Sequence, residues 1–262
     1  MNTRFLIAVP LVLLTAGSVQ AKLVTQPVAY THEGVQLEGY LAYDDAAAGK
    51  RPGVLVVHEW WGLNDYVRGR AEQLAEMGYV AFALDMYGKG RMTDHPDQAG
   101  AWMKAVNSNM SLWLGRALAG LEVLKKQPQV DTGRLAAIGY CFGGATVQVL
   151  AYGGAGLKGV VSFHGSLVPP SAEQGERTRA RMLICHGAQD PFNKPDALTA
   201  YVQALNATSI DWQLIVYGNT RHGFTNPGAG KFGMDALAYN PDSDRRSWQQ
   251  MTSFFDEIFP GK

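Results

Sequence analysis

A cysteine between two glycines is the group with the clearest chemical potential in this 262-residue chain. Residues 139–143 read Gly-Tyr-Cys-Phe-Gly, with an apolar run at 134–138 before them and a helix-compatible run at 145–150 after them. A strand, a sharp turn and a helix in that order form a nucleophile elbow, in which glycines leave room for a strained turn. The N–H groups at the start of the helix favour a thiolate and an oxyanion, so Cys141 is a candidate nucleophile.

The motif alone also fits a structural cysteine. The chain has 30 glycines, and free cysteine is among the most buried residue types. A reactive thiol needs a base, and histidine is the usual one. Of the six histidines, His222 follows the last predicted strand and can reach over the sheet edge. We expect His32, in a hairpin turn, and His95, at a helix start, to be exposed to solvent, whereas His164 and His186 close strands and could support the site.

The base needs a carboxylate that orients it, and Asp190 follows the predicted strand at 181–185. An aspartate before a proline also favours turns, so this residue by itself is ambiguous. Cys141, Asp190 and His222 nevertheless follow successive predicted strands, in the chain order that is typical of α/β-hydrolase triads. The order therefore predicts a triad of these three residues.

The elements that must position this triad alternate between strands and helices. Predicted strands lie at 23–30, 35–43, 53–57, 79–84, 134–138, 157–163, 181–185 and 211–217. Predicted helices lie at 65–77, 97–126 with a break near 108–109, 145–150, 194–205 and 244–259, and residues 168–179 are predicted to be a loop. The pattern predicts an α/β-hydrolase fold, a mostly parallel twisted sheet with helices on both faces. Ligands bind at the carboxyl ends of such strands, where Glu59 also lies.

The N-terminal residues have the pattern of a secretory signal peptide. Arg4 precedes an apolar run at 5–14, and the segment ends with a small-x-small-like pattern at Val19-Gln20-Ala21. The run is shorter than the roughly 20 residues that a membrane-spanning helix needs, although an uncut N-terminal anchor is the alternative. We therefore expect a signal peptide at 1–21, a single domain at 22–262, a periplasmic or secreted location, and no membrane attachment after cleavage.

Two cysteines in an oxidising compartment could form a disulfide. Cys185 lies in a predicted buried strand, whereas Cys141 lies at a turn beyond another strand. We expect no bond between them and interpret Cys185 as a small core residue. A thiol redox protein is an alternative, but the chain has no C-x-x-C motif and Cys185 would have to lie within disulfide range of the other thiol.

Charge and composition argue against several other functional classes. Lysine plus arginine and aspartate plus glutamate both number 23, so the formal net charge is zero and no nucleic-acid surface is indicated. The chain has no H-E-x-x-H motif and no cysteine cluster for a metal. The Gly-rich turn also lacks a phosphate-binding lysine. We expect no metal, no nucleotide or other cofactor, no nucleic-acid partner, and a monomer.

Several segments together resemble the dienelactone hydrolase family of α/β hydrolases, over essentially all of the chain after residue 21. The matching segments are 57–64 (Val-His-Glu-Trp-Trp-Gly-Leu-Asn), 85–87 (Asp-Met-Tyr), 139–144, the Asp190 loop and 222–224 (His-Gly-Phe). The resemblance implies a Cys-Asp-His triad that hydrolyses small lactones and esters. It also implies that Glu59 controls the protonation of the thiol, and that the backbone N–H groups of Phe142 and Trp60 form the oxyanion hole.

The sequence departs from the family's best-known pattern at two positions where arginines bind the substrate carboxylate. These positions hold Lys89 and Asn226. Lysine offers a point charge without a bidentate fork, and asparagine offers no charge. We expect Lys89, Trp61 and Phe224 to contact the substrate. Together with Trp60, the aromatic residues predict a pocket for an uncharged or larger acyl group.

These observations favour a hydrolase that cleaves small esters or lactones, like a carboxymethylenebutenolidase, through a cysteine nucleophile and a thioester intermediate. Its partner is then a small-molecule ester or lactone. Two alternatives stay open: a thioesterase, peptidase or other acyl hydrolase of the same fold, and a non-catalytic periplasmic binding protein. The complete triad argues against the second alternative.

Overall fold

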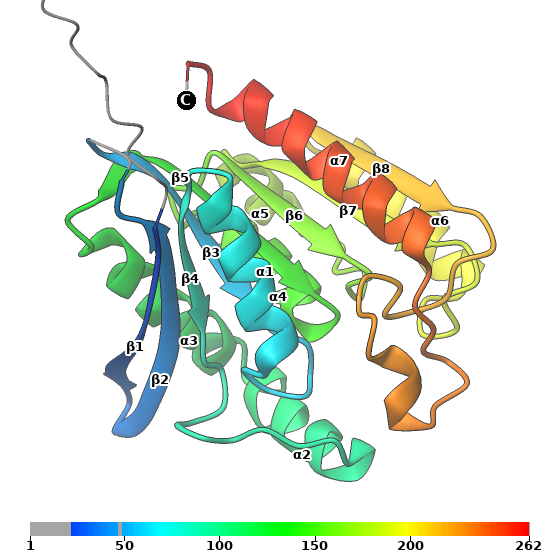
Figure 1. The fold of residues 1–262 in the computed structure, drawn as a ribbon. Helices are drawn as coiled ribbons and strands as arrows, with labels where there is room; N and C mark the ends of the chain where they lie inside the picture. Colours follow the sequence, from blue (N-terminus) through cyan, green and yellow to red (C-terminus); the bar gives the residue numbers. More distant parts are fainter. Residues whose placement is uncertain (1–21, 47–48, 262) are drawn as a thin grey trace, which may run out of the picture.

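The computed structural model describes residues 22–46 and 49–261, and the expected signal peptide at 1–21 lies outside them. The described residues form one eight-stranded sheet with helices on both faces (Figure 1). The strands are β1 (Leu23–His32), β2 (Val35–Asp44), β3 (Arg51–Val57), β4 (Val80–Leu84), β5 (Val130–Tyr140), β6 (Gly159–Phe163), β7 (Arg181–Gly187) and β8 (Trp212–Tyr217). The helices are α1 (Asp65–Glu76), α2 (Pro96–Asn107), α3 (Met110–Lys125), α4 (Phe142–Tyr152), α5 (Ala172–Arg177), α6 (Pro195–Asn206) and α7 (Pro241–Ile258), with a short 3₁₀ helix, η1 (Ala229–Phe232).

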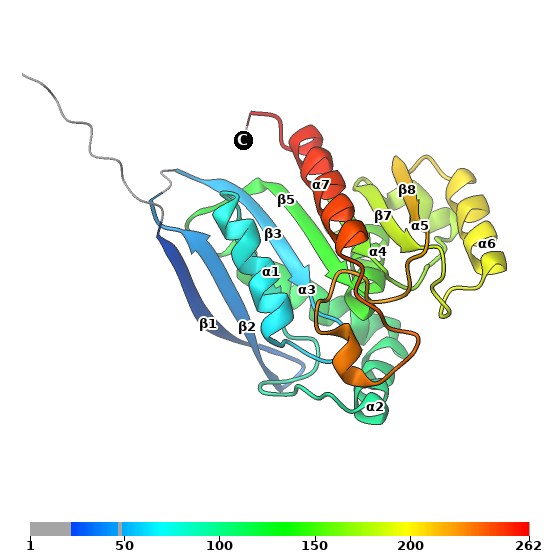
Figure 2. The same cartoon turned by 45° about the vertical axis from the view of Figure 1, so that its right-hand side comes forward.

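The sheet is mostly parallel. Its strands are ordered β1-β2-β4-β3-β5-β6-β7-β8. β2 pairs with β1 and with β4 in antiparallel fashion, and every pair from β4–β3 to β7–β8 is parallel. Figure 2 shows α1 and α7 on one face of the sheet and α3 and α4 on the other. The predicted α/β-hydrolase fold is therefore confirmed.

A hydrophobic core lies on each face of the sheet, because the central strands are buried on both sides. In β3, Leu55 and Val57 belong to the core beneath α3 and α4, whereas Val54 and Val56 belong to the core beneath α1 and α7. All seven residues of β3 are buried. The strand is held from both faces, which fixes its carboxyl end where the candidate site begins.

Most element boundaries follow the local chemistry that predicted them. The Asn64 side chain caps α1, and the Asn109 side chain caps α3 at the predicted break between α2 and α3. The predicted loop at 168–179 is wrong in part, because α5 lies within it. Ser171 and Gln174 form a reciprocal capping box at the start of α5, a sequence signal that the loop prediction overlooked.

The carboxyl ends of the parallel strands meet at one edge of the sheet, and the candidate residues follow them. β3 leads to Glu59, β5 to Cys141 and β7 to Asp190, and the loop after β8 carries His222. Four separate strands therefore deliver these side chains to one region. Within the described part of the chain, no helix is long and apolar enough to span a membrane.

Candidate active site

Cys141 occupies the strained turn between β5 and α4. Its backbone has φ of +53° and ψ of −114°, which residues with side chains rarely adopt. A Cβ at Gly139 would lie 2.0 Å from the carbonyl oxygen of Gly143, and a Cβ at Gly143 would lie 2.2 Å from that of Val57. Close backbone approach therefore requires both glycines, as the elbow motif predicts.

Two backbone N–H groups beside the thiol could hold an oxyanion. Phe142 is the first residue of α4, so its N–H has no partner within the helix. Trp60 follows Glu59 in the turn after β3, and both Phe142 and Trp60 line the same cavity as Cys141. Their placement fits an oxyanion hole, and their role as donors stays a prediction.

His222 and Asp190 form a buried hydrogen-bonded pair. The Oδ2 atom of Asp190 lies 2.8 Å from Nδ1 of His222. The carboxylate also accepts hydrogen bonds from the Phe192 N–H and from the Asn193 side-chain amide. Burial opposes the charge of Asp190, but the hydrogen bond and the positive charge of His222 outweigh burial and lower the pKa of Asp190. The carboxylate therefore holds a proton on Nδ1 of His222.

The other ring nitrogen of His222 faces the reaction space. Nε2 is buried without a partner at ordinary hydrogen-bond geometry, and His222 lines the same cavity as Cys141. Burial by itself lowers the pKa of His222, but the nearby Cys141 sulfur and Asp190 outweigh burial and raise it to about 10. This balance favours the imidazolium form of His222 beside Cys141.

Glu59 is buried after β3, and its Oε2 accepts a 2.7 Å hydrogen bond from the side-chain amide of Asn226. Burial raises the pKa of Glu59 to about 7, while the Asn226 bond and the charges of His222, Arg70 and Lys231 limit the rise. Glu59 therefore changes charge near neutral pH, beside the triad. Asn226 lies at a position that the resemblance associates with substrate binding, but here it contacts Glu59.

His58 is a site residue that the sequence analysis missed. Its Nε2 accepts a 3.2 Å hydrogen bond from the Met86 N–H, so the ring proton lies on Nδ1, which donates to the backbone carbonyl of Glu59. Burial lowers the pKa of His58 and keeps the ring neutral. His58 therefore fixes the main chain that carries Glu59 and Trp60. Its place after a buried strand is the only sequence signal for this role.

A cavity of about 200 Å³ opens at Cys141. Its lining residues are Trp60, Met103, Asn107, Trp113, Cys141, Phe142, Ala145, Ser166, Val168, Phe192, His222 and Leu237. Apart from the triad groups, the lining contains no ionisable side chain. The Trp113 indole N–H donates to the Thr146 hydroxyl at 2.8 Å, and its ring stacks on Phe142. This wall of the cavity is therefore apolar and fixed in place.

The structure places three expected substrate contacts away from this cavity. The Lys89 ammonium group is exposed and pairs with Glu38 at 2.7 Å. Trp61 is buried and stacks on an aromatic ring of η1, and Phe224 is buried in the core. None of the three lines the cavity. Trp60, and not its neighbour, lines the cavity, and substrate contact by Lys89, Trp61 and Phe224 stays a prediction.

The remaining histidines differ in their surroundings. His95 is exposed, as predicted, but His32 is partly buried because Gly115 of α3 leaves room for its ring. Burial lowers the pKa of His164 and of His186, which keeps both rings neutral. Within residues 22–46 and 49–261, no group of three or more His, Cys, Asp or Glu side chains is arranged to hold a metal ion.

Both cysteines are free. Cys185 belongs to the core beneath α1 and α7, as the sequence predicted, whereas Cys141 packs against the core on the opposite face of the sheet. The sheet separates the two thiols, so Cys185 cannot serve as the resolving cysteine of a redox pair without backbone movement.

Known proteins share the sequence and the fold of this chain. The family described as "Dienelactone hydrolase family" matches residues 37–259. A relative from Aquifex aeolicus (strain VF5), named as a carboxymethylenebutenolidase, is 27% identical over 238 residues, which cover 88% of this chain and 97% of that protein.

Two solved structures have higher sequence identity. A protein named m3DLH is 43% identical, with a TM-score of 0.87, over 90% of this chain and 99% of its own. A dienelactone hydrolase-like promiscuous phosphotriesterase from metagenomic libraries is 37% identical, with a TM-score of 0.87, over 90% of this chain and 98% of its own. Sequence and fold therefore lead to the same family.

The hydrogen bond from Asn226 favours the ionised form of Glu59. We expect the substitution Asn226→Ala to raise the pKa of Glu59 above its value of about 7, because burial then acts with less opposition. A pH titration of the glutamate carboxyl carbons by NMR measures this shift. Asn206→Ala, at the exposed end of α6, is the matched control. An unchanged Glu59 titration in Asn226→Ala contradicts the expectation.

Proposed function

Because the chain belongs to the dienelactone hydrolase family, whose members hydrolyse esters and lactones, we propose that it hydrolyses small uncharged esters or lactones through Cys141. One observation carries the proposal. The strained Cys141 and the ring of His222 line one cavity, and Asp190 holds Nδ1 of that imidazole at 2.8 Å, which leaves Nε2 for the thiol. This is the arrangement that activates a thiol as a nucleophile.

The proposed reaction has two halves. In the first, the Cys141 sulfur attacks the carbonyl carbon, and the His222 imidazolium gives its proton to the leaving alkoxide as the C–O bond breaks. A thioester and a neutral His222 remain. In the second half, Nε2 of His222 takes a proton from water while the water oxygen attacks the thioester carbon. The C–S bond then breaks, which releases the acid and restores the thiolate beside the imidazolium.

Two further groups support these steps. In this mechanism the N–H groups of Phe142 and Trp60 stabilise the developing oxyanion, and one such donor is typically worth about 3 kcal/mol. Glu59 influences the charges of the Cys141 sulfur and the His222 imidazole. Its carboxylate stabilises the His222 imidazolium, whereas it opposes a second negative charge on the sulfur. Because the pKa of Glu59 is about 7, this influence changes within the neutral range.

The cavity wall supports an uncharged substrate. No lysine or arginine lines it, and Lys89 is engaged with Glu38 outside it. A carboxylate in this space would lose water without gaining a cation, which is costly. The Trp113 and Phe142 rings instead offer apolar area to an acyl or alcohol group. This favours small neutral esters and lactones over a lactone that carries a carboxylate.

A second candidate activity is the hydrolysis of neutral phosphotriesters. The observation that favours it is the same uncharged cavity, together with the 37% identity to a promiscuous phosphotriesterase. A phosphotriester has no formal charge, and its P=O oxygen can occupy the oxyanion site. The sulfur would attack phosphorus, and the leaving oxide would take the His222 proton as its P–O bond breaks. Neutral His222 would then take a proton from the water that cleaves the S–P bond and restores the thiolate.

We further propose that residues 1–21 direct export and that the chain from Lys22 works as a monomer in the periplasm or outside the cell. The support is the charged start, the apolar run and the small-residue end of this segment. Cys141 then has no disulfide partner on its own face of the sheet, since Cys185 lies in the opposite core.

Cys141→Ala removes the proposed nucleophile. We expect kcat/KM for p-nitrophenyl acetate and butyrate to fall by about 10³-fold or more, because the remaining groups act only through the thiol. Cys185→Ala is the matched control and should keep the activity. Hydrolysis that survives in Cys141→Ala would show that another group is the nucleophile, and an inactive wild type on every ester and lactone would favour a binding protein.

A cavity without a cation in its wall predicts that the protein prefers neutral substrates to negatively charged ones. We expect kcat/KM for p-nitrophenyl butyrate, a neutral lactone and diethyl p-nitrophenyl phosphate to exceed kcat/KM for a dienelactone carboxylate by about ten-fold or more. Met103→Lys places a cation in the wall and should improve the carboxylate substrate, whereas Met103→Leu should not. Equal turnover of charged and neutral substrates would contradict the proposal for the cavity.

Export is tested by separating the cell fractions and measuring the molecular mass of the protein in each by mass spectrometry. We expect full-length protein expressed in a bacterium to be recovered from the periplasm or medium with an N-terminus at about Lys22. Replacing Val12 and Leu13 by arginines interrupts the apolar run and should retain an uncut chain in the cytoplasm. An uncut chain in the membrane fraction would support the N-terminal anchor instead.

A further inference from the structure

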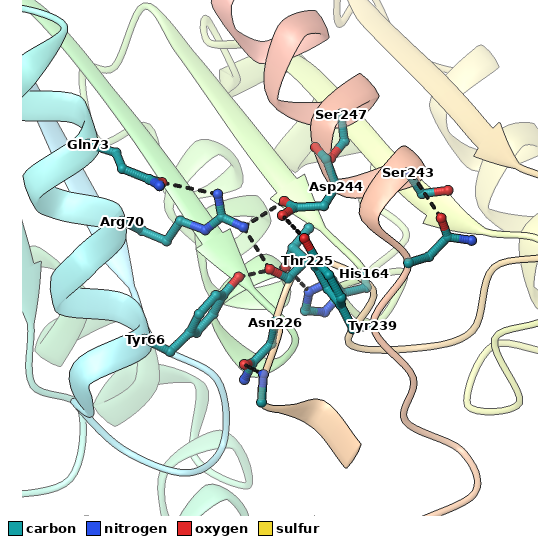
Figure 3. Close-up of polar contacts among 12 residues, drawn as sticks. Tyr66, Arg70, Gln73, His164, Thr225, Asn226, Tyr239, Ser243, Asp244 and Ser247 are labelled. Carbon is teal, nitrogen blue, oxygen red and sulfur yellow. Dashed lines mark hydrogen bonds and ion pairs between the residues drawn. The ribbon is translucent and has the colours of Figure 1, made fainter. Parts of the chain in front are cut away.

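Arg70 is a buried arginine that the proposed chemistry does not use. It lies on α1 and is 7% exposed. Its Nη2 donates to the backbone carbonyl of Thr225 at 2.6 Å and to Oδ1 of Asp244 on α7 at 2.5 Å. Figure 3 shows the guanidinium between these two partners. A single group therefore joins α1, α7 and the loop after β8.

Three aromatic rings confine this guanidinium. Its central carbon lies 5.4 Å from the ring centre of Tyr66, 5.8 Å from that of Tyr140 and 5.1 Å from that of Trp248. These rings come from α1, β5 and α7 respectively. Stacking and cation–π attraction fix the plane of the guanidinium, and only arginine combines such stacking with a fork of donors.

Thr225 is held through its side chain as well as its carbonyl. Its hydroxyl oxygen lies 2.6 Å from the Tyr66 hydroxyl and 2.7 Å from Nε2 of His164 (Figure 3). The ring of His164 in turn lies 5.0 Å from the ring of His222. Thr225 is thus bound to three residues, Arg70 and Tyr66 of α1 and His164 after β6, and it cannot shift without breaking several buried polar contacts.

The residues beside Thr225 carry the chemistry. Asn226 follows it directly and donates the 2.7 Å hydrogen bond to Glu59, and His222 precedes it by three residues in the same loop. A displacement of the Thr225 carbonyl therefore moves a triad residue and the Glu59 partner together. Reactivity is sensitive to such movement, since a shift of about 1 Å can cost about 100-fold in rate.

We propose that Arg70 is a positioning residue for the reaction: by joining the Thr225 carbonyl to Asp244, it sets the place of His222 and Asn226 in the site. The inference rests on the proposed function for its kinetic readout. Arg70 touches neither the cavity nor the thiol. Its effect passes through the loop that carries the reacting groups.

The charge of Arg70 adds a second, separable effect. The groups that face Glu59 are Asn226 and His222 from the loop after β8, Lys231 from η1 and Arg70 from α1, and all four favour its ionised form. Tyr66 of α1 and Tyr140 of β5 also face Glu59, and burial raises the pKa of both phenols, so they are neutral near pH 7. Removing the cation should therefore raise the pKa of Glu59, whereas lysine at this position should not.

The test compares four variants of the full chain: Arg70→Met, Arg70→Lys, Asp244→Asn and Arg245→Met. Arg70→Met removes the contacts and the charge, whereas Arg70→Lys keeps the charge but loses the fork. Asp244→Asn weakens the α7 contact and leaves Arg70 in place. Arg245→Met, next to Asp244 on the exposed side of α7, is the matched control. kcat, KM and their pH dependence are measured for p-nitrophenyl butyrate, per free Cys141 thiol.

We expect Arg70→Met to lower kcat by about 100-fold while KM changes by less than about three-fold. The acid limb of its pH profile should move to higher pH. Arg70→Lys should recover part of kcat and keep the acid limb of the wild type, and Asp244→Asn should lower kcat without moving that limb upward. Arg245→Met should match the wild type. If Arg70→Met does not fold, kcat and its pH dependence in Arg70→Lys and Asp244→Asn still test the positioning role of Arg70.

A second readout does not depend on the choice of substrate. Alkylation of Cys141 by iodoacetamide, followed by mass spectrometry from pH 5 to 10, reports how the loop places His222 and Glu59 around the sulfur. We expect this profile to change in Arg70→Met and Asp244→Asn but not in Arg245→Met. Unchanged alkylation and kcat in both would overturn the role of Arg70. Changed alkylation in a chain that hydrolyses no ester would instead overturn the proposed function and leave the positioning role standing.

Discussion

The close approach of three backbone segments at the elbow is the constraint on which the rest of the site depends. The turn at Cys141 needs contact between Gly139 and the first turn of α4, and it brings Gly143 against the carbonyl of Val57 at the end of β3. The strained φ of +53° persists because a fully buried strand fixes the other side of this contact. The same contact that shapes the turn at Cys141 therefore places this residue beside the segment that carries Glu59, so two candidate site residues from distant parts of the chain share one steric cause.

Burial then sets the chemistry, and it acts on the two titrating groups in opposite ways. It raises the pKa of Glu59 to about 7, because the Asn226 amide and the charges of His222, Arg70 and Lys231 offset burial only in part. It lowers the pKa of His222, but the sulfur and the Asp190 carboxylate reverse the effect and bring the value to about 10. The two groups therefore titrate in separate pH ranges, Glu59 near neutral pH and His222 well above it. This separation allows an imidazolium to persist beside a carboxyl group that can gain or lose its proton.

The succession of strands along the chain and the residues that follow them could be predicted, because both are local features of the sequence. Cys141, Asp190 and His222 each follow an apolar run, and a parallel sheet brings such ends together. The direction of an aromatic side chain in a loop is not local. Trp60 and Trp61 are adjacent, yet their rings point to different surroundings. Trp61 stacks on Phe232, which is far away in the sequence, whereas Trp60 lines the cavity. The sequence analysis missed the role of His58 for the same reason, because the Met86 N–H that binds its ring follows a different strand, β4.

The placement of cations connects the binding chemistry with the packing. The cavity wall has none, Lys89 is engaged at the surface, and residue 226 is an asparagine that contacts Glu59. Arg70 is a buried cation outside the cavity, where it donates to the Thr225 carbonyl and the Asp244 carboxylate. From there its charge still favours ionised Glu59, but it is not available to a substrate. The cation that influences Glu59 is therefore separate from the wall of the cavity, so the proposed preference for a neutral ligand and the proposed positioning role of Arg70 are compatible.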